Sequence, residues 1–531
     1  MGGGLMQLVA YGAQDVYLTG NPEITFFKIV YRRHTNFSCE SIENQFSGSA
    51  DFNRTASCPI VRNADLVTKM YLRVTVEGTR TSGTGRWAFV TKLGHALINN
   101  VELNIGGSKI DRHYGDWFNV KYALMRESKH DRGYDKMIGN TAENTELADV
   151  ASRTVSMHVP LLFSNCLHDG LALPLISLQY HDTRLEFQFR RASDVVVTEG
   201  DAVVSASFTS ADVLTDYIYL DNIERRKFAQ ASHEYLIEQV QHSGNESVTS
   251  SRHNVRLNSY NHPTKAIFFA LKLGKYTSGE SFLAYHPSDA AKMREEATKR
   301  LILANANKGS SDDLVETDGD GTILVNNAAS AFPSGLSAVC LSHGAAPTAA
   351  APIEYEGSAD VDNVQLIGGL MTKALMSTSI SDLVSGNYIR SDRATACPTT
   401  GRSGYDVTVR QFDNYGLNLD RSDNPVSEVL LQLNGHDRFS QRSGDYFNYV
   451  QPYQHFKDTP ADGVNVYSFG LDPCKHQPSG SLNLSRIDEP VLSLWLNGSE
   501  TFGNSTNVFV FVHSYNVLRI MSGMGGLAYS N

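Results

Sequence analysis

The chain has 531 residues, of which 41% are hydrophobic and 19% are charged, and its formal net charge at pH 7 is −11. A chain of this length exceeds the usual size of one hydrophobic core, so we expect a soluble globular protein with two domains. The acidic balance argues against a general nucleic-acid binder, which needs a concentrated basic surface.

The cysteines and the first residues of the chain indicate the cellular compartment in which the protein is made. No CxxC pair occurs among the six scattered cysteines, which are Cys39, Cys58, Cys166, Cys340, Cys397 and Cys474. This spacing favours free thiols in a reducing compartment over a disulfide framework. The first residues, MGGGLMQLVAYG, lack the pattern of a signal peptide, and no stretch approaches the roughly 18 apolar residues of a membrane span. We therefore expect a soluble protein that is made in the cytoplasm.

The first element in chain order is a long N-terminal segment, in which residues 8–37 read LVAYGAQDVYLTGNPEITFFKIVYRRHTNF. This segment resembles the N-terminal signature of major capsid proteins from nucleocytoplasmic large DNA viruses, of the phycodnavirus, mimivirus and iridovirus kind. Its apolar positions need a partner surface, because the segment is too short to form its own core; they are Leu5, Leu8, Val9, Val16 and Leu18. A small basic run is either a solvated strand end or a contact with acidic partners inside a shell; it comprises Lys28, Arg32, Arg33 and His34.

Short strands dominate the rest of the chain. Apolar and polar residues alternate with period two in residues 72–77, 101–105 and 185–189, which is typical of strands with one buried face. Residues 508–512 (VFVFV) are apolar throughout, which indicates a strand that is covered on both faces. Turn residues separate these strands, as expected for an all-β sandwich protein with few helices.

Two distant stretches of the chain share one pattern, which predicts that one β-unit occurs twice. Residues 101–105 (VELNI) are followed by a glycine turn, Arg112 and GDWFN at 115–119; residues 429–433 (VLLQL) are followed by a glycine turn, Arg438 and GDYFN at 444–448. Further on, residues 158–163 precede the strand at 185–189 much as 464–469 precede a strand at 491–496, and aromatic-rich strands near 217–220 and 508–512 close the halves. Chance similarity of two strand-turn segments is the alternative. Duplication predicts that Trp117-Phe118 and Tyr446-Phe447 occupy equivalent places.

The two copies differ in length. A charged stretch within residues 221–232 marks the expected boundary, and the extra chain of the second copy lies at about 277–424. That insertion is rich in Ala, Gly, Ser, Thr and Asp, which indicates surface loops more than core. One helix is expected near residues 288–304, where apolar residues recur at helical spacing after Ser288.

No pattern in the sequence points to a catalytic centre. It contains no HxH pair, HExxH motif, GxSxG elbow or phosphate-binding loop. Residues 318–321 (DGDG) are similar to the start of a calcium loop, but Thr322 and Ile323 stand where a further oxygen ligand and the turn glycine belong. A glycosidase-like carboxylate pair stays open, although nothing singles one out. We therefore assign no catalytic, cofactor-binding or metal-ligating residues, and no cofactor.

The resemblance implies a specific architecture and role. Members of this family fold as two consecutive eight-stranded antiparallel jelly rolls, which would place an N-terminal arm at residues 1–23, the first roll at 24–222 and the second at 223–531, with a surface insertion at about 277–424. Three copies would form a pseudo-hexameric capsomer of an icosahedral shell around double-stranded DNA. The implied partners are further copies of the chain, minor capsid and penton proteins, and a nearby internal viral membrane, with no direct nucleic-acid binding. The implied location is the outer capsid of the virion, assembled in the host cytoplasm.

Two other classes of protein remain as alternatives. One is a non-enzymatic β-sandwich surface or fibre component that binds carbohydrate or a host receptor. The other is a metal- or carboxylate-dependent enzyme on a jelly-roll scaffold. The internal repeat and the N-terminal segment favour a capsid protein over both.

Overall fold

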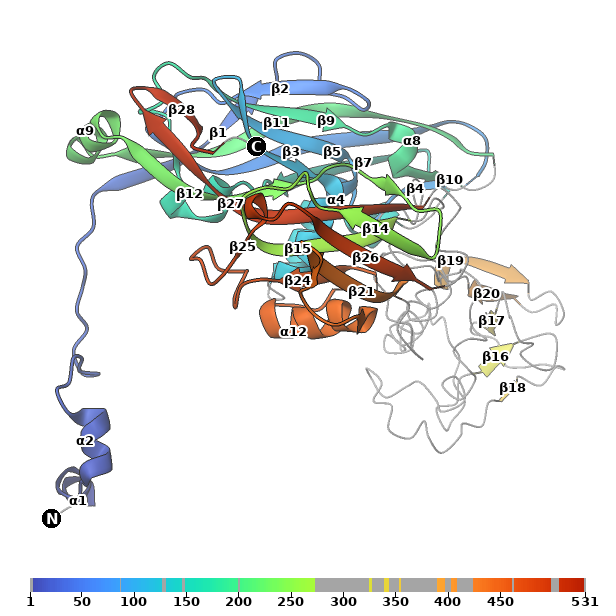
Figure 1. The fold of residues 1–531 in the computed structure, drawn as a ribbon. Helices are drawn as coiled ribbons and strands as arrows, with labels where there is room; N and C mark the ends of the chain where they lie inside the picture. Colours follow the sequence, from blue (N-terminus) through green and yellow to red (C-terminus); the bar gives the residue numbers. More distant parts are fainter. Residues whose placement is uncertain are drawn as a thin grey trace.

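The computed structural model describes residues 3–529 with several gaps (Figure 1). The gaps are residue 86 and residues 127–129, 146–148, 199–200, 461–462 and 498–505, and between 273 and 423 only five short strands are described. These strands form one sheet in the order β18-β16-β17-β20-β19 and comprise β16 (Leu324–Asn326), β17 (Val339–Ser342), β18 (Ile353–Glu354), β19 (Ile389–Ala396) and β20 (Ser403–Val407). The helix expected at 288–304 lies outside the described residues.

The first unit is a sandwich of two antiparallel sheets. One sheet has the order β1 (Phe37–Gln45), β11 (Val203–Leu220), β3 (Leu66–Ser82), β7 (Ser152–Pro160). The other has the order β2 (Thr55–Pro59), β9 (Thr183–Phe189), β5 (Ile98–Ile105), β6 (Ser108–Tyr114). Three short strands are added: β8 (Leu173–Pro174) pairs with β3, and β4 (Trp87–Phe89) pairs with β10 (Val196–Thr198).

The second unit repeats this plan. One sheet has the order β12 (His233–Gln241), β27 (Asn507–Met521), β15 (Pro263–Lys272), β24 (Asn465–Ser468). The other has the order β14 (Arg252–Arg256), β26 (Pro490–Leu496), β21 (Val426–Leu433), β22 (His436–Asp437). Short strands again join the sheets, namely β13 (Glu246–Ser247), β23 (Arg442–Ser443), β25 (Leu482–Asn483) and β28 (Met524–Leu527).

The strand order is the same in both units. Replacing β1, β11, β3 and β7 by β12, β27, β15 and β24 reproduces the first sheet, and the facing sheets correspond in the same way. Even the added strands agree, because β8 pairs with β3 as β25 pairs with β15. Two four-stranded antiparallel sheets joined in this order form a jelly roll. The predicted all-β double sandwich and its duplication are therefore confirmed.

The predicted strands lie in the cores of the two units. In β3 the inward positions Leu72, Val74 and Val76 are fully buried, and they alternate with partly exposed residues. Residues 508–512 in β27 are all buried, as expected for a strand that is covered on both faces. The alternation predicted from the sequence thus reports the side of each sheet that faces its partner sheet.

Helices are few and mostly short. They are α1 (Gly3–Val9), α2 (Ala13–Thr19), α3 (Leu93–Ala96), α4 (Gly115–Met125), α5 (Asp131–Met137), α6 (Ala142–Thr145), α7 (Ser164–Leu167), η2 (Asp169–Leu171), α8 (Ala192–Val195), α9 (Asn222–Gln230), η7 (Tyr446–Val450), α12 (Gln451–His455) and η8 (Leu484–Arg486). Helix α9 follows β11 and precedes β12 in the chain. None of the described helices is long and apolar enough to cross a membrane.

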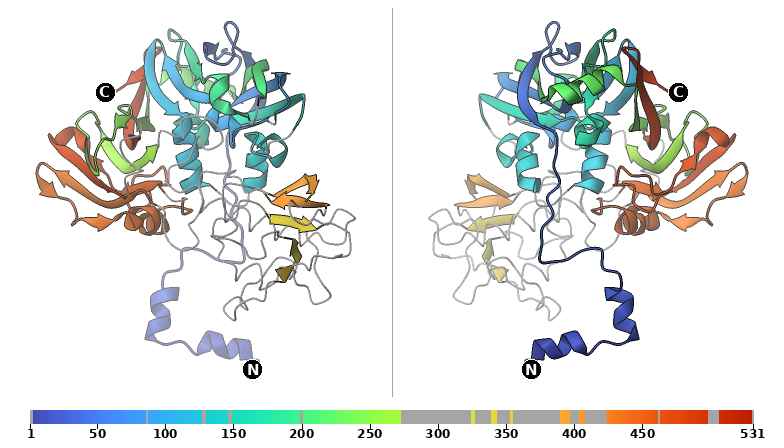
Figure 2. Two further views of the ribbon diagram at one scale, coloured as in Figure 1. Left: turned by 90° about the vertical axis from the view of Figure 1, so that its right-hand side faces the viewer. Right: turned by 90° about the vertical axis from the view of Figure 1, so that its left-hand side faces the viewer.

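The segment before β1, residues 3–36, which includes the N-terminal arm, extends away from the sandwiches (Figures 1 and 2). It carries α1 and α2 and then runs without regular structure to β1. Its large apolar side chains are exposed, including Leu8, Leu18, Phe26 and Phe27. The arm therefore presents the unpartnered apolar surface that the sequence led us to expect.

Candidate functional site

The sequence GDxFN starts the helical segment that follows the corresponding hairpin in each unit. A Cβ atom added at Gly115 would lie 2.4 Å from the carbonyl oxygen of Ile98, the first residue of β5. A Cβ atom added at Gly444 would lie 1.9 Å from the carbonyl oxygen of Val426, the first residue of β21. Both positions thus need glycine because the backbone passes against the start of the corresponding strand.

The next residues of the motif also correspond. Phe118 and Phe447 are fully buried, each in the core of its own unit. Asn119 and Asn448 are fully buried as well, and each accepts a hydrogen bond from a neighbouring loop: Asn119 from Lys92 Nζ at 3.2 Å, and Asn448 from the Gly463 amide at 3.0 Å. The predicted equivalence of Trp117-Phe118 and Tyr446-Phe447 is confirmed for their place in the fold. Their surroundings differ, since Trp117 is fully buried and Tyr446 only partly.

Trp117 is buried because it packs against the second unit. Together with Val120 and Leu124 on the same face of α4, it joins an apolar cluster on the outer face of β15 and β27 (Figure 1). The Trp117 ring centroid lies 5.1 Å from that of Phe268 and 5.6 Å from that of Phe511. The residues of the second unit in this cluster are Val240, Ala266, Phe268, Ala270, Val464, Val466, Phe509 and Phe511. The two units are therefore joined by a continuous apolar junction.

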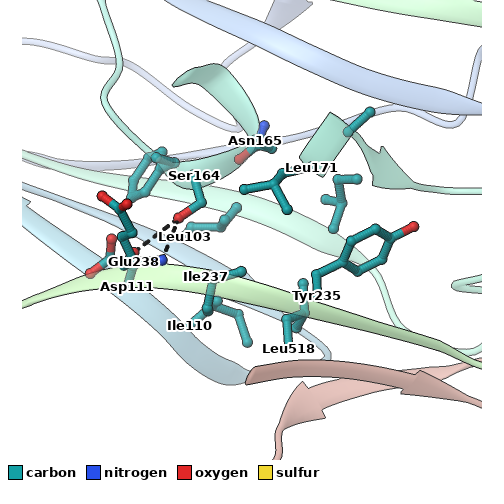
Figure 3. Close-up of a pocket in the computed structure, with 13 residues that line it drawn as sticks. Leu103, Ile110, Asp111, Ser164, Asn165, Leu171, Tyr235, Ile237, Glu238 and Leu518 are labelled. Carbon is teal, nitrogen blue, oxygen red and sulfur yellow. Dashed lines mark hydrogen bonds between the residues drawn. The ribbon is translucent and has the colours of Figure 1, made fainter. Parts of the chain in front are cut away.

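A second contact between the units surrounds a small cavity (Figure 3). Its walls come from both units, with Leu103, Ile110 and Leu171 facing Tyr235, Ile237 and Leu518. The Ser164 hydroxyl donates to the Glu238 carbonyl at 3.0 Å and accepts from the Glu238 amide at 2.9 Å. A volume of about 20 Å³ holds roughly one water molecule, so the cavity is a seam between the units and not a ligand pocket.

Beside this seam the Glu238 carboxylate is buried among cations and histidines. Lys265 Nζ lies 2.6 Å from Oε1, His476 Nδ1 3.2 Å from Oε1 and His513 Nε2 3.0 Å from Oε2. Burial would raise the pKa of Glu238, but these neighbours hold it far below its ordinary value. Burial also lowers the pKa of His513, so that ring is neutral at pH 7 and Lys265 supplies the balancing charge.

Three side chains at this place have the geometry of a possible metal site. Ligand atoms of His168, Glu238 and His476 lie within 4.8 Å of one another. However, Lys265 Nζ already bonds Glu238 Oε1, the oxygen nearest to His476, and its positive charge would repel a divalent ion. The donor set therefore does not fit a metal.

We accordingly expect elemental analysis of the purified protein to find no stoichiometric transition metal. The reason is that a divalent ion would have to displace Lys265 from its carboxylate. The matched control is the His476→Ala variant, whose metal content should be the same as that of the parent protein. One zinc or iron per chain, lost in the variant, would contradict this expectation.

Other features noted in the sequence are placed as follows. The basic residues Lys28, Arg32, Arg33 and His34 are exposed in the segment between the arm and β1. The DGDG stretch at 318–321 lies outside the described residues. The described cysteines Cys39, Cys58, Cys166 and Cys474 are free thiols. The sequence did not lead us to predict the network of Glu238, Lys265 and His513. A signal that could have indicated a buried charge pair is the lysine within the apolar run of β15.

The chain matches two protein-family models. The one described as "Major capsid protein N-terminus" matches residues 25–221, and the one described as "Large eukaryotic DNA virus major capsid protein" matches residues 224–365 and 378–526. The chain is 39% identical to "Capsid protein 1" of Acanthamoeba polyphaga mimivirus and 35% identical to the major capsid protein of Paramecium bursaria Chlorella virus 1, with both proteins covered completely in each case.

Solved structures show the same likeness. The crystal structure of PBCV-1 VP54, fitted into a reconstruction of the virophage Sputnik, has a TM-score of 0.60 and 31% identity; the match covers 96% of this chain and 100% of that one. The Faustovirus major capsid protein has a TM-score of 0.62 over 96% of this chain and 94% of the other. Its identity of 12% makes it evidence of the fold alone.

Proposed function

The chain belongs to the major capsid proteins of large eukaryotic DNA viruses, a structural and non-enzymatic family of the virion capsid, and from this premise we propose that three copies form a pseudo-hexagonal capsomer. Such capsomers would tile the icosahedral outer shell. Contacts between capsomers would then be made by further copies of the same chain.

The observation that carries the proposal is the identical strand order of the two units. A hexagonal lattice needs building blocks with nearly sixfold outline, whereas closed homo-oligomers are built from identical chains. Three chains with two similar units each supply six similar units around a threefold axis. A duplicated sandwich is therefore the geometry that a trimeric capsomer requires.

The test is the mass of the purified protein in solution. We expect a stable homotrimer, so light scattering during gel filtration should give about three times the chain mass of 58.4 kDa. Obligate contacts of this kind commonly bury more than roughly 2,000 Å², which keeps the trimer intact on dilution. A monodisperse monomer at micromolar concentration would count heavily against the capsomer.

We further propose that residues 24–222 and 223–531 are the two rolls, that residues 1–23 lie at the base of the capsomer, and that the insertion at 277–424 lies on its outer surface. The register of the sheets supports a position of the arm and the insertion at opposite ends of the sandwiches. The start of β1 (Phe37) pairs with the end of β11, beside the start of β3. The insertion instead follows Lys272 at the end of β15, the counterpart of the end of β3. In Figure 1 the arm leaves the left-hand side of the body and the strands β16–β20 lie at its lower right-hand side.

The exposed apolar residues of the arm favour burial against minor capsid or penton proteins at the base, close to an internal membrane, after assembly in the host cytoplasm. We expect limited proteolysis of intact particles to spare residues 1–23 until the particles are disrupted, because the shell would enclose them. Isolated trimers are the control and should lose the arm early. Early loss of the arm from intact particles would place it outside.

A further inference from the structure

Each unit of a closed ring uses two faces, one toward each neighbour. The junction within one chain contains one face of each kind. The helical face is α4 of the first unit, and it packs on the receiving face, which is the outer face of β15 and β27 of the second unit. In a ring of six similar units, the second unit must present its corresponding helix to the first unit of the next copy. The identity of the second contact can therefore be read from the duplication.

The helical face of the second unit follows from the shared GDxFN motif. Aligning residues 115–119 with 444–448 places Trp117, Val120 and Leu124 opposite three tyrosines, namely Tyr446, Tyr449 and Tyr453. The segment starts as the π-helix η7 and continues as α12, and Tyr446 packs against the core of its own unit, where the Arg442 guanidinium lies over its ring. Tyr446 and Tyr449 are partly buried, whereas Tyr453 is 86% exposed. We name Tyr449 and Tyr453, which follow Tyr446 in the helical segment, the tyrosine face.

The receiving face of the first unit follows from the sheet register. Phe268 of β15 pairs with Phe511 of β27 and with Val466 of β24. Arg73 of β3 has the corresponding neighbours, since it pairs with Asp212 of β11 and with His158 of β7. Phe268 lies three residues after Lys265, whose carbonyl accepts a hydrogen bond from the Phe469 amide. Arg73 likewise lies three residues after Met70, whose carbonyl accepts a hydrogen bond from the Leu161 amide.

The first unit carries charges where the second carries aromatic rings. Arg73 Nη2 lies 2.7 Å from Asp212 Oδ2 and 2.7 Å from Glu43 Oε1. The side chains of Arg73 and Glu43 are 33% and 49% exposed, so the group lies on the open face of the sheet. We name Glu43, Arg73 and Asp212 the charged face.

We propose that the tyrosine face of one copy binds the charged face of the next copy in the trimer. Tyrosine suits this partner because its ring covers the Arg73 guanidinium while its hydroxyl hydrogen-bonds the carboxylates. The different chemistry of the two contacts also has a physical reason. The junction within a chain is buried during folding and can be apolar, whereas the contact between chains is exposed to water until the subunits meet.

This inference rests on the proposed trimer, and photo-crosslinking tests it directly. p-Benzoylphenylalanine at position 453 of the full chain should crosslink to peptides of β1, β3 or β11, the strands that carry the charged face. In trimers assembled from mixed ¹⁴N- and ¹⁵N-labelled copies, the crosslinked pairs should combine both labels. Crosslinks to the second unit of another copy, or within one copy, would overturn the inference and leave the trimer standing.

Substitutions give an independent measurement. Tyr453→Ala and Glu43→Lys should each weaken the trimer by about tenfold per interface, as loss of an interface tyrosine or a charge pair commonly does. The control is Tyr180→Ala, because Tyr180 is 74% exposed and its amide bonds Gly523 of the second unit on the side of the internal junction. A wild-type monomer would overturn both the inference and the proposed function. Wild-type trimers that Tyr453→Ala and Glu43→Lys leave unweakened would overturn the inference alone.

Discussion

Replacing Trp117 with alanine should lower the free energy of unfolding by about 3–5 kcal/mol, the usual cost of removing a large buried aromatic side chain. Trp117 is fully buried, and its ring lies against Phe268 and Phe511 of the other unit. Its loss would therefore leave a cavity at the junction itself, with few neighbours free to fill it.

Denaturant unfolding followed by circular dichroism, at one fixed protein concentration, measures this effect. Tyr180→Ala is the control and should change the stability by no more than about 0.5 kcal/mol, because an exposed side chain loses few contacts. We also expect the Trp117→Ala transition to separate into two steps, since each unit keeps its own core. Equal stabilities of the two variants would mean that the units do not pack as described.

The repeated fold could be predicted from sequence because its signals are local. The GDxFN motif fixes a glycine against the start of a strand, and the phenylalanine after it enters the core of the same unit. Period-two alternation likewise needs only neighbouring residues to show which side of β3 is buried. The strands β16–β20 were missed, because strands of this length within a segment rich in small residues give little alternation to detect.

The junction could not be predicted because its partners are far apart in the chain. The apolar run of β15 indicates a strand covered on both faces, but nothing in the run indicates that α4 packs on its outer face. The pairing of Glu238 with Lys265 and His513 is equally hidden, since a buried charge pair follows no sequence spacing. The tyrosine face became recognisable only when the structure showed what Trp117, Val120 and Leu124 contact.

Replacing Lys265 with methionine should destabilise the protein by about 3–5 kcal/mol near pH 8, because it leaves the Glu238 carboxylate buried without its cation. The double variant Lys265→Met, Glu238→Gln is the matched control and should recover most of this loss, since it removes both charges. The defect of the single variant should shrink as the pH falls toward 6. With Lys265 gone, the buried negative charge of Glu238 favours binding of a proton to the pair that it forms with His513. The folded state then takes up this proton as the pH falls, which offsets part of the destabilisation, and releases it as the pH rises. Unfolding curves of the three proteins between pH 6 and 9 test this, and a defect that grows on acidification would show that Lys265 is not the charge that balances Glu238.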